Sequence, residues 1–320
     1  MGIGHHLALL LGGSLWGLGA LLIRCLGSRG WAVLDIAPIR GTVSFVLLAG
    51  LVLATRPGML AIRPQDRRYL VLAGILGPGL TGPLFMLCIM GAPLGIAVLL
   101  NYGAPVYAAI LSWPLLGERP DRRKVFALTL LMLGLLLVTG LLEGAAGEAV
   151  RPRTGALLAG FCSGLTFALY LVTTRRVATS CDPAAMQVWK FGAGLPVLWG
   201  MRVLWGGPPS LPPLDLPAVG LLLLLALGPH IAGHLLVNYG LARVQAAPGS
   251  ILLTTEPLMA MALGWAVLGE RATIPQLAGM GLILAAIGAA SSSRPRPGPV
   301  STPCMLSPRG SCQVPRSDCR

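Results

Sequence analysis

Residues 104–119 read APVYAAILSWPLLGER, and residues 256–271 read EPLMAMALGWAVLGER. In both stretches a proline is followed after twelve residues by Gly-Glu-Arg, and the two copies are offset by 152 residues. A second pair of matching steps, Gly77-Pro78 and Gly228-Pro229, has an offset of 151 residues. Matches at a nearly constant offset indicate an internal repeat, so we predict that the chain consists of two similar halves.

The composition around these stretches is typical of a membrane protein. Of 320 residues, 55% are hydrophobic and only 11% are charged, and the mean hydropathy is +0.77. Soluble domains carry about 25% charged residues. The net charge of +13 would suggest nucleic-acid binding in a soluble protein. Here the basic residues lie in short connectors and in the tail, where such residues set topology and contact anionic lipid. We therefore expect the lipid bilayer, and not nucleic acid, as the partner.

Ten apolar runs approach the length of about 20 residues that a spanning helix needs. The first run has no Lys or Arg before it and no A-x-A-like cleavage site after it, so we interpret it as a spanning helix and not as a signal peptide. The fold prediction is an all-α integral membrane protein with ten transmembrane helices. The runs lie at about 7–24, 36–55, 69–90, 93–115, 122–141, 154–174, 184–205, 217–241, 248–268 and 273–290.

The two halves are predicted to lie upside down relative to each other. Each half has five spans, and an odd number of spans reverses the direction in which the next half enters the membrane. We assign residues 1–145 to the first five-helix repeat, 150–290 to the second, and 291–320 to a disordered cytoplasmic tail rich in Ser, Pro and Arg. Inverted repeats are typical of secondary transporters, in which the substrate site lies where the repeats meet.

The distribution of basic residues predicts the orientation. With the tail left out, the connectors on the side of the two termini hold eleven Lys and Arg residues, and those on the opposite side hold six. The positive-inside rule therefore places both termini in the cytoplasm. The seven cysteines form no CxxC pair and no pattern of a disulfide framework or metal site, and we predict no cofactor.

With these motifs the chain resembles the drug/metabolite transporter superfamily, specifically its EamA-type members. In those proteins the fourth helix of each half contains a proline and ends in Gly-Glu, and the fifth helix carries a glycine. The resemblance covers about residues 7–290 and implies a plasma-membrane transporter that usually exports small polar metabolites, often amino acids or their relatives. The matching residues here are Pro105, Gly117-Glu118 and Gly134, and then Pro257, Gly269-Glu270 and Gly281.

Two basic residues lie inside predicted spans, each early in the second helix of its half. They are Arg40 and Lys190, at an offset of 150 residues. A basic residue near a helix centre costs about 2.5–3.5 kcal/mol, so it usually faces a cavity or a partner. In a cavity, both would bind a carboxylate or phosphate of the substrate. Alternatively, both side chains reach the nearer membrane interface.

Glu256 is the acidic residue predicted to lie deep in a span, and its counterpart in the first half is Ala104. It would bind a substrate amine, pair with a cation or carry a coupling proton; the alternative is a neutral packing role. Asn101 and Tyr102 occupy the matching stretch of the fourth helix. They would offer hydrogen bonds either to a substrate or to neighbouring helices.

His230, His234 and Asn238 are spaced four residues apart, so they share one face of a helix and predict a face toward the bundle interior. The pair lacks the Glu of a zinc-protease motif and any further nearby His, so we predict no metal site. Trp16 in the first span is expected to wall a cavity, with simple packing or interfacial anchoring as the alternatives.

The Gly-Pro steps are candidate hinges. Gly77, Pro78, Gly228 and Pro229 should weaken the third helix of each half, and Pro105 and Pro257 should kink the fourth. Interrupted helices at corresponding positions point to a transport site, although small residues also allow close helix packing. Glu118 and Glu270, at helix ends near the interface, are interpreted as capping or bridging residues.

These features predict a secondary active transporter, and not an enzyme, that exports a small polar metabolite by alternating access. Arg40, Lys190 and Glu256 together would suit a zwitterion. No Walker-type ATP-binding motif is present. The alternatives are a membrane-embedded lipid-modifying enzyme, which would need a clustered metal or acid-base site, and a scaffold or receptor that does not transport.

Overall fold

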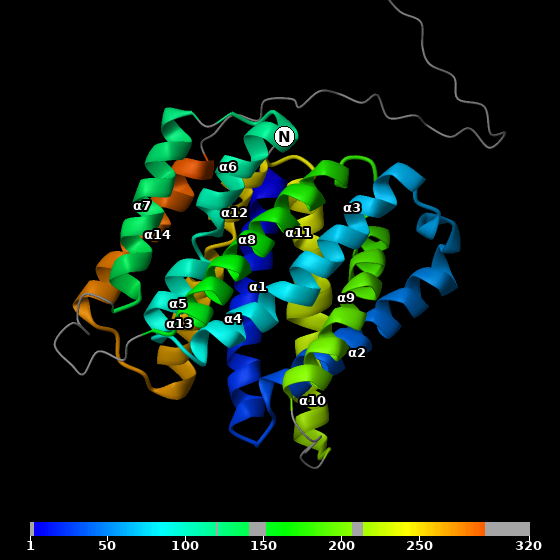
Figure 1. Ribbon diagram of the computed structural model, residues 1–320, viewed down its shortest axis with the longest axis horizontal. Coiled ribbons are helices and arrows are strands. Elements are labelled where there is room, and N and C mark those ends of the chain that lie inside the picture. The colour runs from blue at the N-terminus through cyan, green and yellow to red at the C-terminus, as the bar shows by residue number, and fades with distance from the viewer. Residues whose placement is uncertain (1–2, 120, 141–151, 207–213, 292–320) are drawn as a thin grey trace, which may run out of the picture.

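The computed structural model describes residues 3–119, 121–140, 152–206 and 214–291, and all of the regular structure in these ranges is helical (Figure 1). The predicted disordered tail lies outside the described residues, apart from Ser291 at the end of the last helix.

The first half folds into five helical stretches, two of which are interrupted. The third stretch contains a π-helical segment, η2, between α3 and α4, and the fourth is divided into α5 and α6. The elements are α1 (Ile3–Gly27), α2 (Val33–Thr55), the 3₁₀ turn η1 (Pro57–Leu60), α3 (Pro64–Gly74), η2 (Ile75–Thr81), α4 (Gly82–Ile89), α5 (Leu94–Asn101), α6 (Ala104–Leu116) and α7 (Arg122–Val138).

The second half repeats this order. A π-helical segment, η4, again interrupts the third stretch, and the fourth is again divided in two. The elements are α8 (Thr154–Val177), α9 (Pro183–Trp205), α10 (Leu216–Leu225), η4 (Ala226–Gly233), α11 (His234–Leu241), α12 (Ala246–Leu252), α13 (Thr255–Leu268) and α14 (Ile274–Ser291).

Eight of these helical stretches are long and apolar enough to cross a membrane, when the interrupted ones are counted as continuous. This supports the prediction of an all-helical, multi-pass membrane protein. The other two predicted spans correspond to α7, which has 17 residues, and to α9, which carries Lys190 and Arg202. The total of ten spans therefore stays a prediction.

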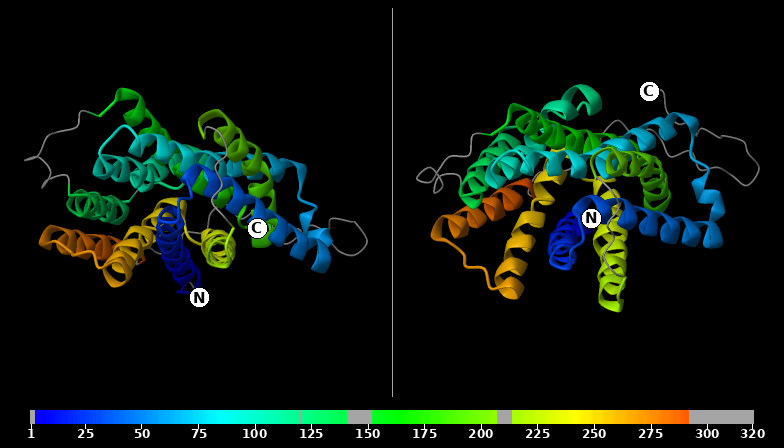
Figure 2. Two further views of the ribbon diagram at one scale, coloured as in Figure 1. Left: turned by 90° about the horizontal axis from the view of Figure 1, so that it is seen from below. Right: turned by 60° about the horizontal axis from the view of Figure 1, so that its bottom comes forward.

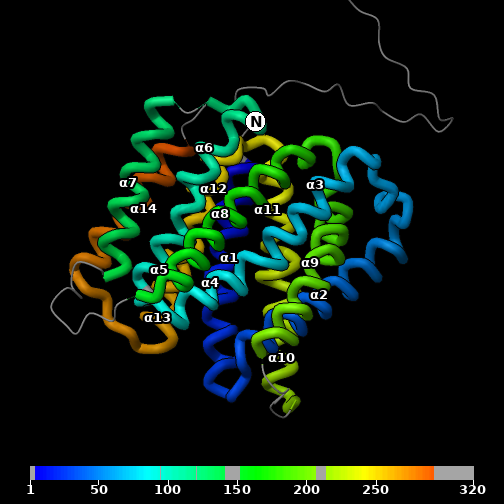
Figure 3. Tube along the Cα trace, in the orientation of Figure 1, coloured from blue at the N-terminus to red at the C-terminus, as the bar shows by residue number. Residues whose placement is uncertain are grey.

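The interruptions follow from the sequence. Pro78 and Pro229 lie inside η2 and η4, where a proline lacks the N–H of the regular helix ladder and crowds the carbonyl four residues earlier. A local π-helical turn accommodates this crowding, so the Cα trace continues through both segments (Figure 3). Pro105 and Pro257 lie in the first turns of α6 and α13, just after the divisions of the fourth stretches.

The glycine of each Gly-Glu-Arg motif ends a helix. Gly117 has φ of 72° and Gly269 has φ of 68°, in the left-handed region that glycine adopts at little cost and that commonly ends helices. Aspartates begin three other helices: Asp121, Asp182 and Asp215 accept hydrogen bonds from backbone N–H groups in the first turns of α7, α9 and α10.

The core is built largely from contacts between the halves. The two fifth helices, α7 and α14, lie side by side (Figures 1 and 2). A Cβ atom at Gly134 would collide with the backbone of Gly279, and one at Gly279 would collide with that of Gly134. The second helices, α2 and α9, also pack together, α1 packs on α11 and α13, and α8 packs on α4 and α6. Several buried polar and charged side chains lie between these helices.

Candidate functional site

Lys190 lies at the centre of the candidate site and is fully buried. Its Nζ atom donates to Oδ1 of Asn238 at 2.6 Å and to the hydroxyl of Tyr170 at 3.3 Å. The ammonium also lies 4.8 Å from the centroid of the Tyr170 ring, which adds a cation–π contact. Polar groups from α8 and α11 therefore surround this cation.

Asn238 is held in the orientation that serves Lys190. Its Nδ2 atom donates to the carbonyl of Pro183 at 3.0 Å and to Oε1 of Gln187 at 3.1 Å. Because both amide hydrogens are used, the remaining acceptor, Oδ1, faces the lysine. Lys190 and Asn238, which the sequence singled out separately, are thus brought together.

The hydrogen bonds of the two histidines define their tautomers. Nδ1 of His234 lies 2.8 Å from the carbonyl of His230, which only accepts, so this nitrogen carries the hydrogen. Ser44 donates to the carbonyl of Ala226 at 3.3 Å and lies 2.9 Å from Nδ1 of His230, so Nδ1 of His230 donates to Ser44. In the neutral form, each histidine keeps Nε2 as an acceptor.

Aromatic rings enclose the histidines. His230 stacks on Phe191 with ring centroids 4.3 Å apart, and His234 lies 4.9 Å from Trp16. Phe167 is 6.0 Å from Trp16, and Tyr170 is 6.3 Å from His234. Trp16 therefore belongs to the cluster, and its role as a cavity wall stays a prediction. The other three rings were not predicted, because their sequence positions do not distinguish them from ordinary packing residues.

Arg40 approaches the same histidines from α2 but has no comparable partner. Its charge acts on both His230 and His234, and its side chain is half-buried. Nε of Arg40 and Nε1 of Trp16 are buried without a hydrogen-bond partner in the part of the chain that the structure describes. Two unpaired N–H donors next to one histidine pair can bind an anionic oxygen.

Glu256 lies in the first turn of α13 and interacts with Tyr102, at the division between α5 and α6. The Tyr102 hydroxyl and the Glu256 carboxylate interact electrostatically. The contact joins the fourth stretches of the two halves. Gly17 allows α1 to approach this turn of α13 closely, because a Cβ atom at Gly17 would collide with the backbone of Glu256.

Asn101 is engaged elsewhere. Its Oδ1 accepts a hydrogen bond from the Ser163 hydroxyl at 2.7 Å, and that hydroxyl also lies 2.8 Å from the carbonyl of Thr81. These contacts join α5 to α8 and to η2. The structure thus favours helix packing over substrate binding for Asn101.

A buried ion pair inside the bundle was not predicted. Arg202, which the sequence placed in a connector, lies in the last turn of α9 and pairs with Asp35 in the first turn of α2. Both side chains are buried. The spacing of the two residues in the sequence gives no signal of this contact, since it depends on how the second helices of the two halves meet.

Among the described residues, no group of three or more His, Cys, Asp or Glu side chains is arranged to hold a metal ion. The site instead contains cations, histidines and a carboxylate that lie between helices. Such groups can bind charged groups of a ligand or a proton.

Comparison with known proteins points in one direction. The sequence model of the EamA-like transporter family matches residues 4–140 and 154–292. The chain is 29% identical over 279 residues to an uncharacterized transporter of Archaeoglobus fulgidus, a match that covers 82% of this chain and 96% of the relative. It is also 29% identical over 236 residues to the threonine/homoserine exporter RhtA of Escherichia coli K12, covering 72% of this chain and 73% of that protein.

The fold also has a counterpart of known crystal structure. That structure matches with a TM-score of 0.69 and 21% sequence identity, over 88% of this chain and 96% of the other. At this identity the match supports the arrangement of the helices and carries no information on the substrate.

Proposed function

The chain belongs to the EamA-like transporter family, and from this premise we propose that it is a secondary active transporter exporting a small polar metabolite by alternating access. We further propose ten spans in two inverted five-helix repeats. The matched interruptions at η2 and η4 and in the two fourth stretches support this arrangement. So does the packing of each fifth and second helix on its counterpart in the other half.

The proposal depends mainly on one observation, the buried and unpaired N–H group of Arg40. Its Nε is buried without an acceptor among the described side chains, in a stretch that can cross a membrane. An arginine in such a place costs about 2.5–3.5 kcal/mol, and a buried donor without a partner adds to that cost. A substrate carboxylate would meet the guanidinium with two parallel hydrogen bonds.

The proposed substrate is an amino acid or a related compound. A carboxylate at Arg40 and an amine at Glu256 would suit a zwitterion, and the relative RhtA is named as an exporter of threonine and homoserine, which are zwitterions. Glu256 is also the candidate for a coupling proton, because it is a carboxylate between helices whose interaction partner in the described part of the chain is the uncharged Tyr102. No enzymatic step is part of the proposal.

We place the protein in the plasma membrane with both termini in the cytoplasm. The basic connectors on the side of the termini support this orientation. The exported compound would then move from the side that holds the termini to the opposite side.

The test compares the media of cells that express the wild type, Arg40→Ala or Arg123→Ala at equal membrane levels. Arg123 is an exposed arginine in the first turn of α7 and serves as the matched control. A panel that includes threonine and homoserine should show a compound that accumulates with the wild type and the control. Loss of a charge-assisted bond should lower its export by about tenfold or more with Arg40→Ala. Media that match empty cells for all three proteins would refute export.

A further inference from the structure

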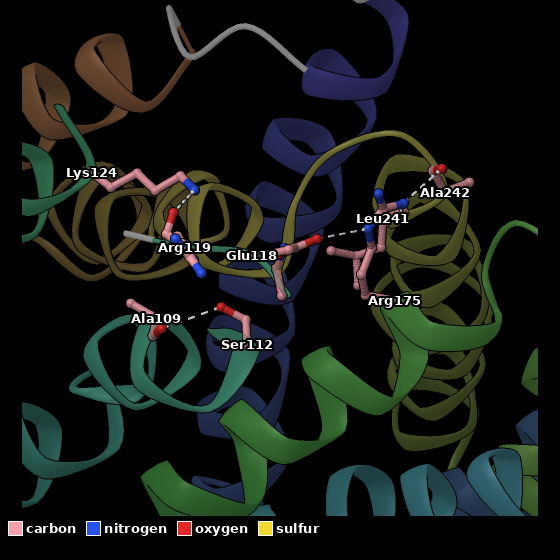
Figure 4. Close-up of polar contacts among 9 residues, drawn as sticks. Ala109, Ser112, Glu118, Arg119, Lys124, Arg175, Leu241 and Ala242 are labelled. Atoms are coloured by element: carbon pink, nitrogen blue, oxygen red, sulfur yellow. Dashed lines mark hydrogen bonds and ion pairs between the residues drawn. The ribbon is translucent and has the colours of Figure 1, made fainter. Parts of the chain in front are cut away.

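A buried ion pair holds the helices together on the side of the bundle where α1 begins and α14 ends, here called the terminus side. Nε of Arg175 lies 3.3 Å from Oε1 of Glu118, and the two side chains are only 11% and 10% exposed. Arg175 also donates through Nη1 to the carbonyls of Leu241 and Ala242, at 2.8 Å each (Figure 4). The N–H of Ala246 donates to Oε2 of Glu118 at 2.9 Å.

This network joins four helix ends. Glu118 follows α6, Arg175 lies in the last turn of α8, the two carbonyls end α11, and Ala246 begins α12. Arg175 thus satisfies carbonyls at a helix C-terminus, where a positive charge is favoured, while Glu118 accepts from a helix N-terminus, where a negative charge is favoured.

A second ion pair occupies the matching place on the opposite side. Arg24, in the last turn of α1, lies 2.8 Å from Glu270, which follows α13. In both pairs the glutamate comes from a Gly-Glu-Arg motif and the arginine from the end of the first helix of the other half. The second pair differs in exposure, however, since its side chains are 55% and 46% exposed.

The packing of the helices differs in the same sense. On the terminus side α12 packs on α6, and α8 packs on both α11 and α12. The matching pairs on the opposite side are α5 with α13, and α1 with α4 and α5. Among the described residues, these pairs contact each other less extensively than their counterparts on the terminus side. Around the Gly-Glu-Arg motifs the structure is therefore closed on the terminus side and more loosely packed on the other, where the buried pair of Arg202 and Asp35 joins α2 and α9 instead.

We propose that Glu118 and Arg175 form the gate on the terminus side. During transport this pair would become exposed while the pair of Arg24 and Glu270 becomes buried, and the reverse. In the alternate state Arg24 would donate to the carbonyls at the end of α4, and Glu270 would accept from the first turn of α5. This inference rests on the proposed transport function, because only a transporter needs to open each side in turn.

The physical basis is the difference in burial. An ion pair removed from water is costly to break once formed, whereas an exposed pair contributes little. Of the two Gly-Glu-Arg pairs, only the pair on the terminus side is buried, so this pair favours one of two arrangements of the halves. Weakening it should shift the population toward the other arrangement and not merely loosen the protein locally.

Hydrogen–deuterium exchange of the full chain in lipid nanodiscs tests this inference. Glu118→Gln keeps the size and an acceptor for Ala246 but removes the charge. We expect amides 249–252 of α12 to exchange about tenfold faster or more, and amides 94–101 of α5 to become protected. Glu270→Gln is the matched control and should produce neither change, because it weakens a pair that is already exposed.

Slower amide exchange in α5 distinguishes a gate from an ion pair that only stabilises the helices locally. Faster exchange in α12 with unchanged α5 in Glu118→Gln would overturn the inference. If that variant fails to fold, Arg175→Lys keeps the charge, loses the planar fork and should shift both segments in the same directions by a smaller factor. If the amides of α5 exchange at the same rate in Arg175→Lys and in the wild type, the gate would again be refuted.

The export assay on the same proteins separates the two proposals. If Glu118→Gln shows faster amide exchange in α12 and slower exchange in α5 but the wild type exports nothing, the transport function would be refuted. The two alternating states of the ion pairs would still be supported. Export by the wild type without reciprocal exchange in Glu118→Gln would refute the gate alone.

Discussion

The two halves place a cation at matched positions of their second helices and surround it differently. Lys190 in the second half is fully buried and has oxygen partners on Asn238 and Tyr170. Arg40 in the first half is half-buried and has an unpaired Nε. At the 151-residue offset of the Gly-Pro steps, the counterpart of Asn238 is the apolar Leu87. The repeat thus conserves the position of the charge but not its partners.

From this difference we propose separate tasks for the two cations. A charge whose donors are satisfied within the protein contributes to holding helices together, whereas a charge with an unmet donor remains available to a ligand. The halves have therefore diverged where they meet the candidate substrate, and substitutions at matched positions should have different consequences.

The largest difference is expected between Lys190→Met and Arg40→Met in thermal unfolding of the purified protein. Lys190→Met leaves the buried Oδ1 of Asn238 without its donor, so the free energy of unfolding should fall by about 1–3 kcal/mol. Arg40→Met removes a buried donor that has no partner among the described residues, so stability should stay the same or rise. Equal losses in both variants would remove the distinction between the two cations.

A double variant, Lys190→Met with Asn238→Leu, is the control for this reading. It gives the second half the apolar residue that the first half has at Leu87. Removing both partners of a buried hydrogen bond costs less than removing one, so the double variant should be more stable than Lys190→Met alone. If it is less stable, packing of the lysine chain explains the loss.

The sequence was sufficient for the parts of the fold that depend on local rules. The Gly-Pro steps coincide with η2 and η4, and the Gly-Glu motifs coincide with left-handed helix ends at Gly117 and Gly269. These features follow from the lost N–H of proline and the freedom of glycine at positive φ. Neither requires knowledge of which helices are neighbours.

Contacts between the halves could not be predicted in the same way. The pairing of Glu118 with Arg175 and of Asp35 with Arg202 depends on how each helix is rotated about its axis and on which helices meet. The site shows the same division. Histidines spaced four residues apart predicted one polar face, but the rings of Phe167, Tyr170 and Phe191 around them come from two other helices.

A smaller effect is expected from the second asymmetry between the halves, that of Glu256 and its apolar counterpart Ala104. If the Glu256 carboxylate binds the substrate amine or a coupling proton, Glu256→Gln should reduce export by about tenfold. The remaining export should no longer respond to a protonophore. Tyr102→Phe removes the hydroxyl that meets this carboxylate and should reduce export less, because the charge remains. Full export by Glu256→Gln would give the carboxylate a packing role only.

The smallest effect concerns the two Gly-Glu-Arg glutamates. Burial raises the pKa of Glu118 above its ordinary value, and the Ala246 N–H and the Arg175 guanidinium offset part of this rise. A carboxyl with a higher pKa in the folded state stabilises the fold fully below its ordinary pKa and loses that contribution as pH rises through the folded-state value. The wild type should therefore have a lower melting temperature at a pH above the folded-state pKa of Glu118 than at a pH below the ordinary pKa, and the difference should be no more than about 2–4 °C. Glu118→Gln should remove this component of the pH dependence, and Glu270→Gln, which alters the exposed pair, should keep it. If the pH dependence of the melting temperature disappears with Glu270→Gln instead, the exposed pair responds to protons and the buried pair does not. The roles assigned to the two sides of the bundle would then be reversed.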